Sequence, residues 1–186
     1  VETIGHYAFA ECISLEEVYQ DNLLFGNAMF YKCTSLEYVY NDYDNDGVYV
    51  SGFRDDTTSI GYSAFEGCSS FVEIILPEGD QFTLLQRNVF KGCSVVETIN
   101  IPDNITTIGT YAFRECKSLK NITLPDSIIS IDNCAFWYCT SLSDIIIPDS
   151  VTNIGELAFY GCSSLSSVVL PTSITDIKRS TFSGCS

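Results

Sequence analysis

The stretch ECKSLKNITLPDSIISIDNCAF, residues 115–136, decides the fold because its pattern recurs along the whole chain. The stretch overlaps a Phe-x-x-Cys motif that occurs eight times. The pairs are Phe9/Cys12, Phe30/Cys33, Phe65/Cys68, Phe90/Cys93, Phe113/Cys116, Phe136/Cys139, Phe159/Cys162 and Phe182/Cys185. From Cys93 onward these cysteines are 23 residues apart, and all five prolines lie nine residues after such a cysteine. The sequence is therefore built from internal repeats.

Within the unit, apolar and polar residues alternate at Ile122-Thr123-Leu124, as in a short strand. A turn signal follows at Pro125-Asp126-Ser127, then a second apolar pair, Ile128 and Ile131. The Ala135-Phe136 pair predicts a brief helical turn. A unit this short cannot bury its apolar side alone, so copies must stack. We expect a right-handed solenoid with parallel strands about 4.8 Å apart.

The pattern C-x-x-L-x-x-I-x-L-P-x-x-I-x-x-I-G-x-x-A-F-x-x-C resembles the BspA-like leucine-rich repeat family of bacterial surface antigens. The resemblance covers nearly the whole chain. It implies a leucine-rich-repeat solenoid: a curved stack of about eight 23-residue repeats with a parallel β-sheet on the concave face, and short strands, turns and brief helical turns elsewhere. It also implies a cell-surface or secreted adhesion module that binds an extracellular protein or glycan. The family has no shared catalytic residues.

We interpret residues 1–186 as a single leucine-rich-repeat domain and a fragment of a larger protein, because VETIG (1–5) enters mid-unit and aligns with ITTIG (105–109). The step from Cys33 to Cys68 is 35 residues, 12 more than the regular unit, which predicts an irregular insertion at about 41–57. A net charge of −15 argues against nucleic acid as a partner. No apolar run reaches the roughly 18 residues of a membrane span, so we expect no membrane insertion in this segment. We also expect a monomeric module.

A binding surface is predicted on the concave face. The strand centres point inward: Val18, Val39, Ile74, Ile99, Ile122, Ile145 and Val168. Side chains alternate along a strand, so the neighbours of these residues point outward. The predicted ligand-binding residues are Glu17, Tyr19, Tyr38, Tyr40, Glu73, Ile75, Asn100, Asn121, Asp144 and Ile146. An ordinary solvated sheet face without a ligand is the alternative, and the module would then be a purely structural spacer.

The insertion contains a possible cation site. Asp42, Asp44, Asp46 and Gly47 match the opening of a calcium loop, in which oxygen ligands occupy alternate positions. The twelfth position should be a bidentate Glu, but it is Phe53. We therefore favour an acidic turn between a strand at 37–40 and a hairpin arm at 48–53. Calcium is the less favoured alternative, and no other cofactor is predicted.

The cysteines raise the question of catalysis, because Cys116 in AFRECKSL (112–119) lies among charged residues. Eight cysteines share one repeat position, so we predict buried, reduced thiols in preference to disulfides. Cys134 is interpreted as a packed substitute for an apolar residue, and its spacing does not suit zinc. His6 occupies a position that other repeats fill with unrelated residues. No catalytic residues are predicted, and a cysteine-dependent hydrolase is the least favoured alternative.

Overall fold

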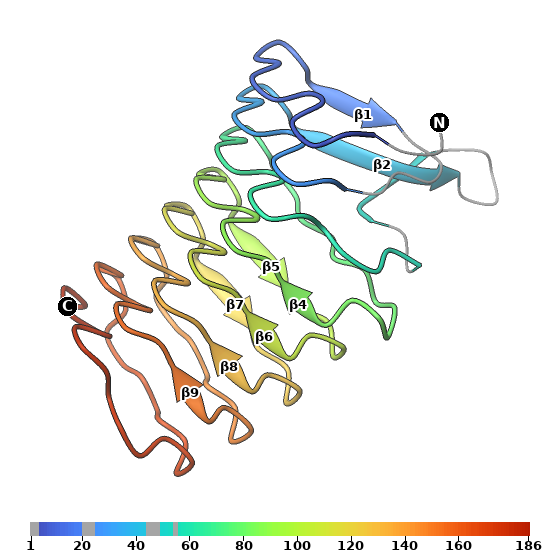
Figure 1. Ribbon diagram of the computed structural model, residues 1–186. Coiled ribbons are helices and arrows are strands. Elements are labelled where there is room, and N and C mark those ends of the chain that lie inside the picture. The colour runs from blue at the N-terminus through green and yellow to red at the C-terminus, as the bar shows by residue number, and fades with distance from the viewer. Residues whose placement is uncertain (1–3, 20–24, 44–48, 54–55) are drawn as a thin grey trace.

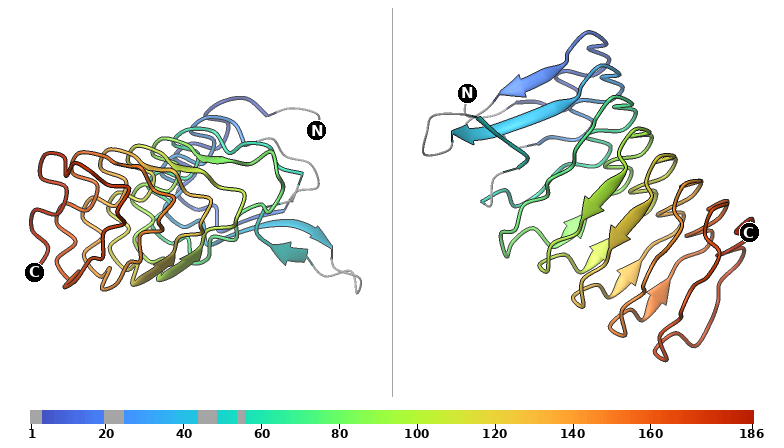
Figure 2. Two further views of the ribbon diagram at one scale, coloured as in Figure 1. Left: turned by 90° about the horizontal axis from the view of Figure 1, so that it is seen from below. Right: turned by 180° about the vertical axis from the view of Figure 1, so that it is seen from behind.

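The computed structural model describes residues 4–19, 25–43, 49–53 and 56–186, and these form a stack of parallel coils. Figures 1 and 2 show the coils following one another along a single axis, from the N-terminal end in blue to the C-terminal end in red. The predicted solenoid with parallel strands is confirmed. Its handedness and its curvature stay predictions.

One side of the stack carries the strands predicted from the alternating stretches. Its longer strands are β1 (Glu17–Tyr19), β2 (Tyr38–Tyr43), β3 (Tyr49–Ser51), β5 (Thr98–Asn100) and β7 (Asn121–Thr123). They form a three-stranded sheet, β1-β2-β3, and a two-stranded sheet, β5-β7, which we together call the first sheet. β1 pairs with β2 and β5 pairs with β7, both in parallel. Single parallel bridges continue the pairing on either side of β5 and β7, at Ile75–Asn100, Asn121–Asp144 and Ile146–Val169.

A second sheet runs along another side of the coils. Its strands are β4 (Leu84–Leu85), β6 (Thr107–Ile108), β8 (Ser130–Ile131) and β9 (Asn153–Ile154), paired in that order and in parallel. Equivalent residues of successive repeats lie side by side, with Leu85 next to Ile108 and Ile108 next to Ile131. The constant repeat length therefore fixes the register of this sheet.

The core is a continuous ladder of aromatic and aliphatic side chains. The phenylalanines of the Phe-x-x-Cys motif stack on one another from Phe9 to Phe182, with ring centroids 5.3 to 5.8 Å apart. Rings this close and nearly parallel gain contact energy beyond the burial of their area. Buried Leu and Ile side chains from both sheets surround the ladder. Each coil therefore depends on its two neighbours for its core.

The predicted helical turns around the Ala-Phe pairs are not found, and β-turns take their place. The amide of Arg114 donates to the carbonyl of Tyr111 at 3.1 Å. The amide of Cys116 donates to the carbonyl of Phe113, also at 3.1 Å. Tyr111 and Glu115 have φ values of 61° and 62°, and a residue in this left-handed region prevents a helix from continuing. The described residues contain no helix, and so none long and apolar enough to cross a membrane.

The extra residues of the longest repeat fold back as a hairpin. β2 pairs antiparallel with β3, and Tyr40 lies opposite Ser51. These strands correspond to the strand and the hairpin arm predicted on either side of the acidic turn. After β3 the chain passes alongside the next coil, where the amide of Phe53 donates to the carbonyl of Ile75 at 3.2 Å. The hairpin projects from the side of the stack in the left view of Figure 2.

The repeated cysteines form a second ladder beside the phenylalanines. Each Sγ from Cys33 to Cys185 donates to the carbonyl of the phenylalanine in the preceding coil, at 2.9 to 3.3 Å. A thiol suits this position because it is a small apolar group with one weak donor. All nine cysteines are free, and burial raises the pKa of the Cys116 thiol to about 12. Cys116 is therefore a protonated, packed side chain at neutral pH.

This arrangement predicts the order in which the thiols react. In the native protein at pH 8, we expect Ellman's reagent to modify the exposed Cys12 first and the half-buried Cys185 more slowly. The buried thiols should react only through local opening, since they are neither accessible nor ionised. In denaturant, all nine should react. A denatured count well below nine would show disulfides and contradict the thiol ladder.

Candidate binding surface

The outward side chains of the first sheet, together with its continuations at 73–75, 144–146 and 167–169, form a surface that we call the first-sheet face. The predicted alternation is confirmed in β5 and β7, whose central Ile99 and Ile122 are buried between exposed neighbours. Among the predicted ligand-binding residues, Tyr38 and Tyr40 are half-buried and the others are exposed. Ile146 is the extreme case, with 80% of its surface exposed. Whether these residues bind a ligand stays a prediction.

The structure gathers four of the predicted residues into one group, the tyrosine cluster: Glu17, Tyr19, Tyr38 and Tyr40. The rings of Tyr19 and Tyr40 stack with centroids 4.8 Å apart, and Tyr38 lies 5.8 Å from Tyr40. The Tyr19 hydroxyl donates to a Glu17 carboxylate oxygen at 2.6 Å. This hydrogen bond, with a smaller contribution from burial, raises the pKa of Tyr19 to about 12. The cluster presents flat aromatic rings, and the Glu17 carboxylate orients the Tyr19 hydroxyl.

The hairpin interrupts the first-sheet face at this point. At the start of the strands the two coils are adjacent, because the amide of Val72 donates to the carbonyl of Glu37 at 3.2 Å. Further along, the amide of Gly52 donates to the carbonyl of Val39, and a side chain on Gly52 would meet Ile75 at 2.8 Å. The predicted strip is thus divided into two parts, the tyrosine cluster on one side of the hairpin and the Ile75 coil on the other.

Beyond the hairpin the first-sheet face is hollowed along β5 and β7. One depression of about 400 Å³ lies over Glu73, Asn100 and Asn121. It shares lining residues with two others, of about 430 and 300 Å³. We call the three together the acidic groove, and its acidic lining residues are Glu73, Glu78, Asp80, Asp103 and Asp144. No described Lys or Arg lines it, so the groove favours a cationic occupant.

The calcium hypothesis falls largely on residues that the structure does not describe. Asp44 and Asp46 lie outside the described residues, and Asp42 belongs to β2. In the described parts of the chain, no group of three or more His, Cys, Asp or Glu side chains is placed to hold a metal ion. Calcium binding at 42–46 therefore stays the less favoured and untested alternative to an acidic turn.

The residues of the hydrolase alternative have structural roles. His6 Nδ1 accepts a hydrogen bond from the backbone amide of Asn27 at 3.1 Å, which ties the first two coils together. Cys116 is buried and donates to the Phe90 carbonyl at 3.2 Å. Cys134 is 6% exposed, and burial raises its pKa. The His6 nitrogen is already bonded to a backbone amide, and burial favours the protonated form of the Cys116 and Cys134 thiols. Neither feature favours nucleophilic chemistry at these residues.

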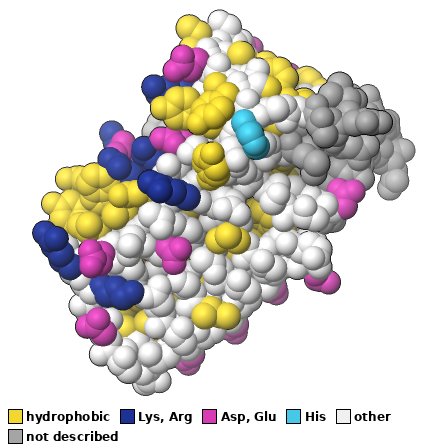
Figure 3. Space-filling view, in the orientation of Figure 1, with side chains coloured by type: hydrophobic (Ala, Val, Ile, Leu, Met, Phe, Trp, Pro, Cys, Tyr) yellow, Lys and Arg dark blue, Asp and Glu magenta, His cyan; other side chains and the backbone are white. Residues whose placement is uncertain are grey.

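A second surface cluster was not predicted from the sequence. It lies on the β-turns that follow the second sheet, and we call it the aromatic–arginine patch: Arg87, Tyr111, Arg114, Trp137, Tyr138 and Tyr160. The Arg114 guanidinium lies 3.7 Å from the Trp137 ring centroid and 5.4 Å from that of Tyr111. The Tyr138 and Tyr160 rings meet edge to face at 5.6 Å. Figure 3 shows a large hydrophobic area bordered by Lys and Arg at this edge, on the left.

One repeat position at the patch has a left-handed backbone. The residue before the motif cysteine has positive φ in every coil, and it is Gly67, Gly92, Gly161 and Gly184 in four of them. In the other four it is Glu11, Lys32, Glu115 and Tyr138, with φ of 56° to 62°, a conformation that costs a non-glycine residue roughly 1–2 kcal/mol. Non-glycine residues occupy this position both at the patch and outside it, so the position alone could not have identified the patch from the sequence.

Comparison with known proteins places the whole chain in one group. The sequence matches the family model described as "BspA type Leucine rich repeat region (6 copies)" over residues 1–54, 50–95 and 83–186. A comparison with curated proteins gives no match.

Solved bacterial structures share the fold. A leucine-rich cell surface protein of Faecalibacterium prausnitzii is 30% identical with a TM-score of 0.71, and the match covers 90% of this chain and 42% of that one. The T. pallidum leucine-rich repeat protein is 24% identical with a TM-score of 0.72, covering 90% and 72%. The pneumococcal vaccine antigen PcpA is 18% identical with a TM-score of 0.50, covering 94% and 55%. The chain thus spans less than half of the F. prausnitzii protein.

Proposed function

The chain belongs to the BspA-type leucine-rich repeat family, and from this premise we propose that it is a non-catalytic cell-surface or secreted module that binds a protein through its first-sheet face. The single observation that carries the proposal is the acidic groove, which adjoins exposed apolar side chains and is lined by no described cation. The cell-surface description of the F. prausnitzii protein supports the location.

The chemistry of the face indicates the kind of partner. The groove supplies carboxylates, while Ile75, Ile146 and Val169 supply apolar area that is 42%, 80% and 77% exposed. The tyrosine cluster adds rigid aromatic surface, which gives large contact area for little loss of side-chain entropy. A protein surface that combines Lys or Arg with apolar side chains would complement all three features.

Neutralising the groove is expected to weaken this binding without affecting the fold. The partner is first selected by screening the chain against an array of extracellular-matrix proteins and glycans. The Asp103→Asn/Asp144→Asn variant should then bind about fivefold more weakly per removed charge, mainly through slower association. Its melting temperature should stay unchanged, because both side chains are exposed. Surface plasmon resonance at two salt concentrations measures the loss.

The control is Glu156→Gln, which removes an exposed charge on the turn side of the coil. It should leave the affinity within twofold. The Tyr19→Ala/Tyr40→Ala variant tests whether the tyrosine cluster shares the partner. A folded chain that binds no member of the array would favour a structural spacer, and preferential binding of glycans over proteins would contradict the proposed class of partner.

A further inference from the structure

The aromatic–arginine patch is a second surface with its own chemistry. Arg87 is exposed and its guanidinium lies 5.8 Å from the Tyr111 ring centroid. Among the described residues it has no carboxylate partner. In a chain of net charge −15, Arg87 is therefore a cation that no described carboxylate neutralises. A stacked guanidinium keeps its planar edge available for a carboxylate.

The centre of the patch is pre-organised. Arg114 donates to one Glu115 carboxylate oxygen from Nε at 3.0 Å and from Nη2 at 2.9 Å. This pair fixes the guanidinium above Trp137, so the charge is already neutralised there and the ring is held in place. Tyr138 extends the surface with 40% of its area exposed. Its ring lies against Gly161, where a Cβ would be 2.9 Å from Tyr138 Cδ1.

The backbone position before the motif cysteine supplies two side chains at the patch. Glu115 and Tyr138 both adopt the left-handed conformation at this position, as Glu11 and Lys32 do outside the patch, and the four other coils have glycine there. Glycine at either position would relieve the strain, but it would remove the ion pair or the exposed ring.

We propose that the aromatic–arginine patch binds an acidic segment of a protein, with a carboxylate on Arg87 and an apolar or aromatic side chain on Trp137 and Tyr138. Trp, Tyr and Arg are the residues that dominate protein–protein binding energy. The patch is cationic and aromatic and the acidic groove is anionic, so the two surfaces select partners of opposite charge.

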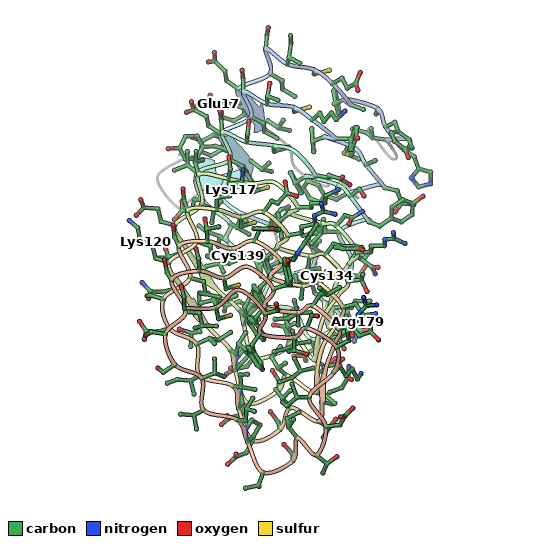
Figure 4. All side chains as sticks on the ribbon, turned by 90° about the vertical axis from the view of Figure 1, so that its left-hand side faces the viewer. Glu17, Lys117, Lys120, Cys134, Cys139 and Arg179 are labelled. Atoms are coloured by element: carbon green, nitrogen blue, oxygen red, sulfur yellow. The ribbon has the colours of Figure 1, made fainter. Side chains whose placement is uncertain are left out.

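The patch carries its own reporter, because Trp137 is the single tryptophan of the chain. We expect a random Glu/Tyr copolymer, titrated into the full chain at low salt, to change the Trp137 fluorescence in a saturable way. Arg87→Gln should raise the half-saturating concentration about tenfold, the effect of losing one charge-assisted hydrogen-bond pair. Lys120→Gln removes one positive charge outside the patch and should change the half-saturating concentration less than twofold. In Figure 4, Lys120 lies at the left, away from Cys134, which precedes Trp137 of the patch by three residues.

Tyr138→Gly separates function from stability. It should weaken copolymer binding about fivefold while the melting temperature stays unchanged or rises, which a purely structural tyrosine would not give. Four outcomes would overturn the proposal: no change in fluorescence, equal losses in Arg87→Gln and Lys120→Gln, tighter binding of polygalacturonate than of the copolymer, or fluorescence that depends on protein concentration alone. The third would indicate an anionic polysaccharide, and the fourth a second copy of the chain. None of these outcomes bears on the acidic groove.

Discussion

Replacing Phe113 with alanine is expected to lower the free energy of unfolding by about 3–5 kcal/mol. The side chain is 1% exposed, and its ring stacks on Phe90 at 5.8 Å and on Phe136 at 5.5 Å. Truncation therefore leaves a cavity between two coils and removes contacts with both. Because a repeat protein is held together by contacts between neighbours, the same change weakens the coupling between the two halves of the stack. We expect a broader unfolding transition, or two transitions.

Urea unfolding followed by circular dichroism and by Trp137 fluorescence would measure both effects, since Trp137 lies in the coil that follows Phe113. The control is Ile129→Ala. Ile129 lies between Phe113 and Phe136 in the sequence, and its side chain is 51% exposed. Its free energy of unfolding should stay within about 0.5 kcal/mol of the parent. Equal losses in the two variants would show that the phenylalanine ladder does not carry the stability assigned to it.

The ladder also explains why the solenoid could be predicted from the sequence. A residue that recurs at a constant step meets its own copy in the next coil, so Phe113 predicts a stack of phenylalanines and Ile108 predicts its pairing with Ile131. The inward and outward positions follow from alternation around Ile99 and Ile122. These features depend on local pattern and repeat length alone.

The turns and the hairpin could not be predicted in the same way. The sequence around Ala112-Phe113 allows a helical turn, but the amide of Glu115 donates to the Trp137 carbonyl of the next coil at 2.7 Å. This contact between coils favours the left-handed conformation of Glu115 over a continuing helix. Likewise, the extra residues after Tyr40 predicted an insertion, but not that it would pack between two coils and divide the first-sheet face. Both outcomes are decided by neighbours distant in sequence.

The two candidate surfaces differ in how much of each the sequence revealed. For the first-sheet face, each outward residue could be identified from its own strand, although the depth of the acidic groove could not. The aromatic–arginine patch required contacts between coils, such as that of Arg114 with Trp137, which lie 23 residues apart. Repeats place equivalent positions side by side, so the residues in which copies differ can form a site that no single copy contains.

Replacing Gly155 with alanine is expected to lower the free energy of unfolding by about 3 kcal/mol, at the upper end of the usual effect of overpacking. A Cβ at Gly155 would lie 2.3 Å from the Asn133 amide nitrogen and 2.5 Å from the Asp132 carbonyl carbon. Both atoms belong to the backbone of the preceding coil and cannot rotate away. The coils would have to separate, which would lengthen the bond from the Gly155 amide to the Ile131 carbonyl, now 2.8 Å.

A matched control exists at the equivalent repeat position, Gly5, where a Cβ would meet nothing within 4 Å. Gly5→Ala should be neutral or stabilising by about 0.4–1 kcal/mol, because alanine reduces the entropy of the unfolded chain without a clash. Thermal and urea unfolding of the two variants therefore compare the same substitution with and without a coil packed against it. Similar stabilities would contradict the close approach of the coils at Gly155. A large difference would assign the requirement for glycine to contact between coils, since the φ angle at Gly155 is not in the left-handed region.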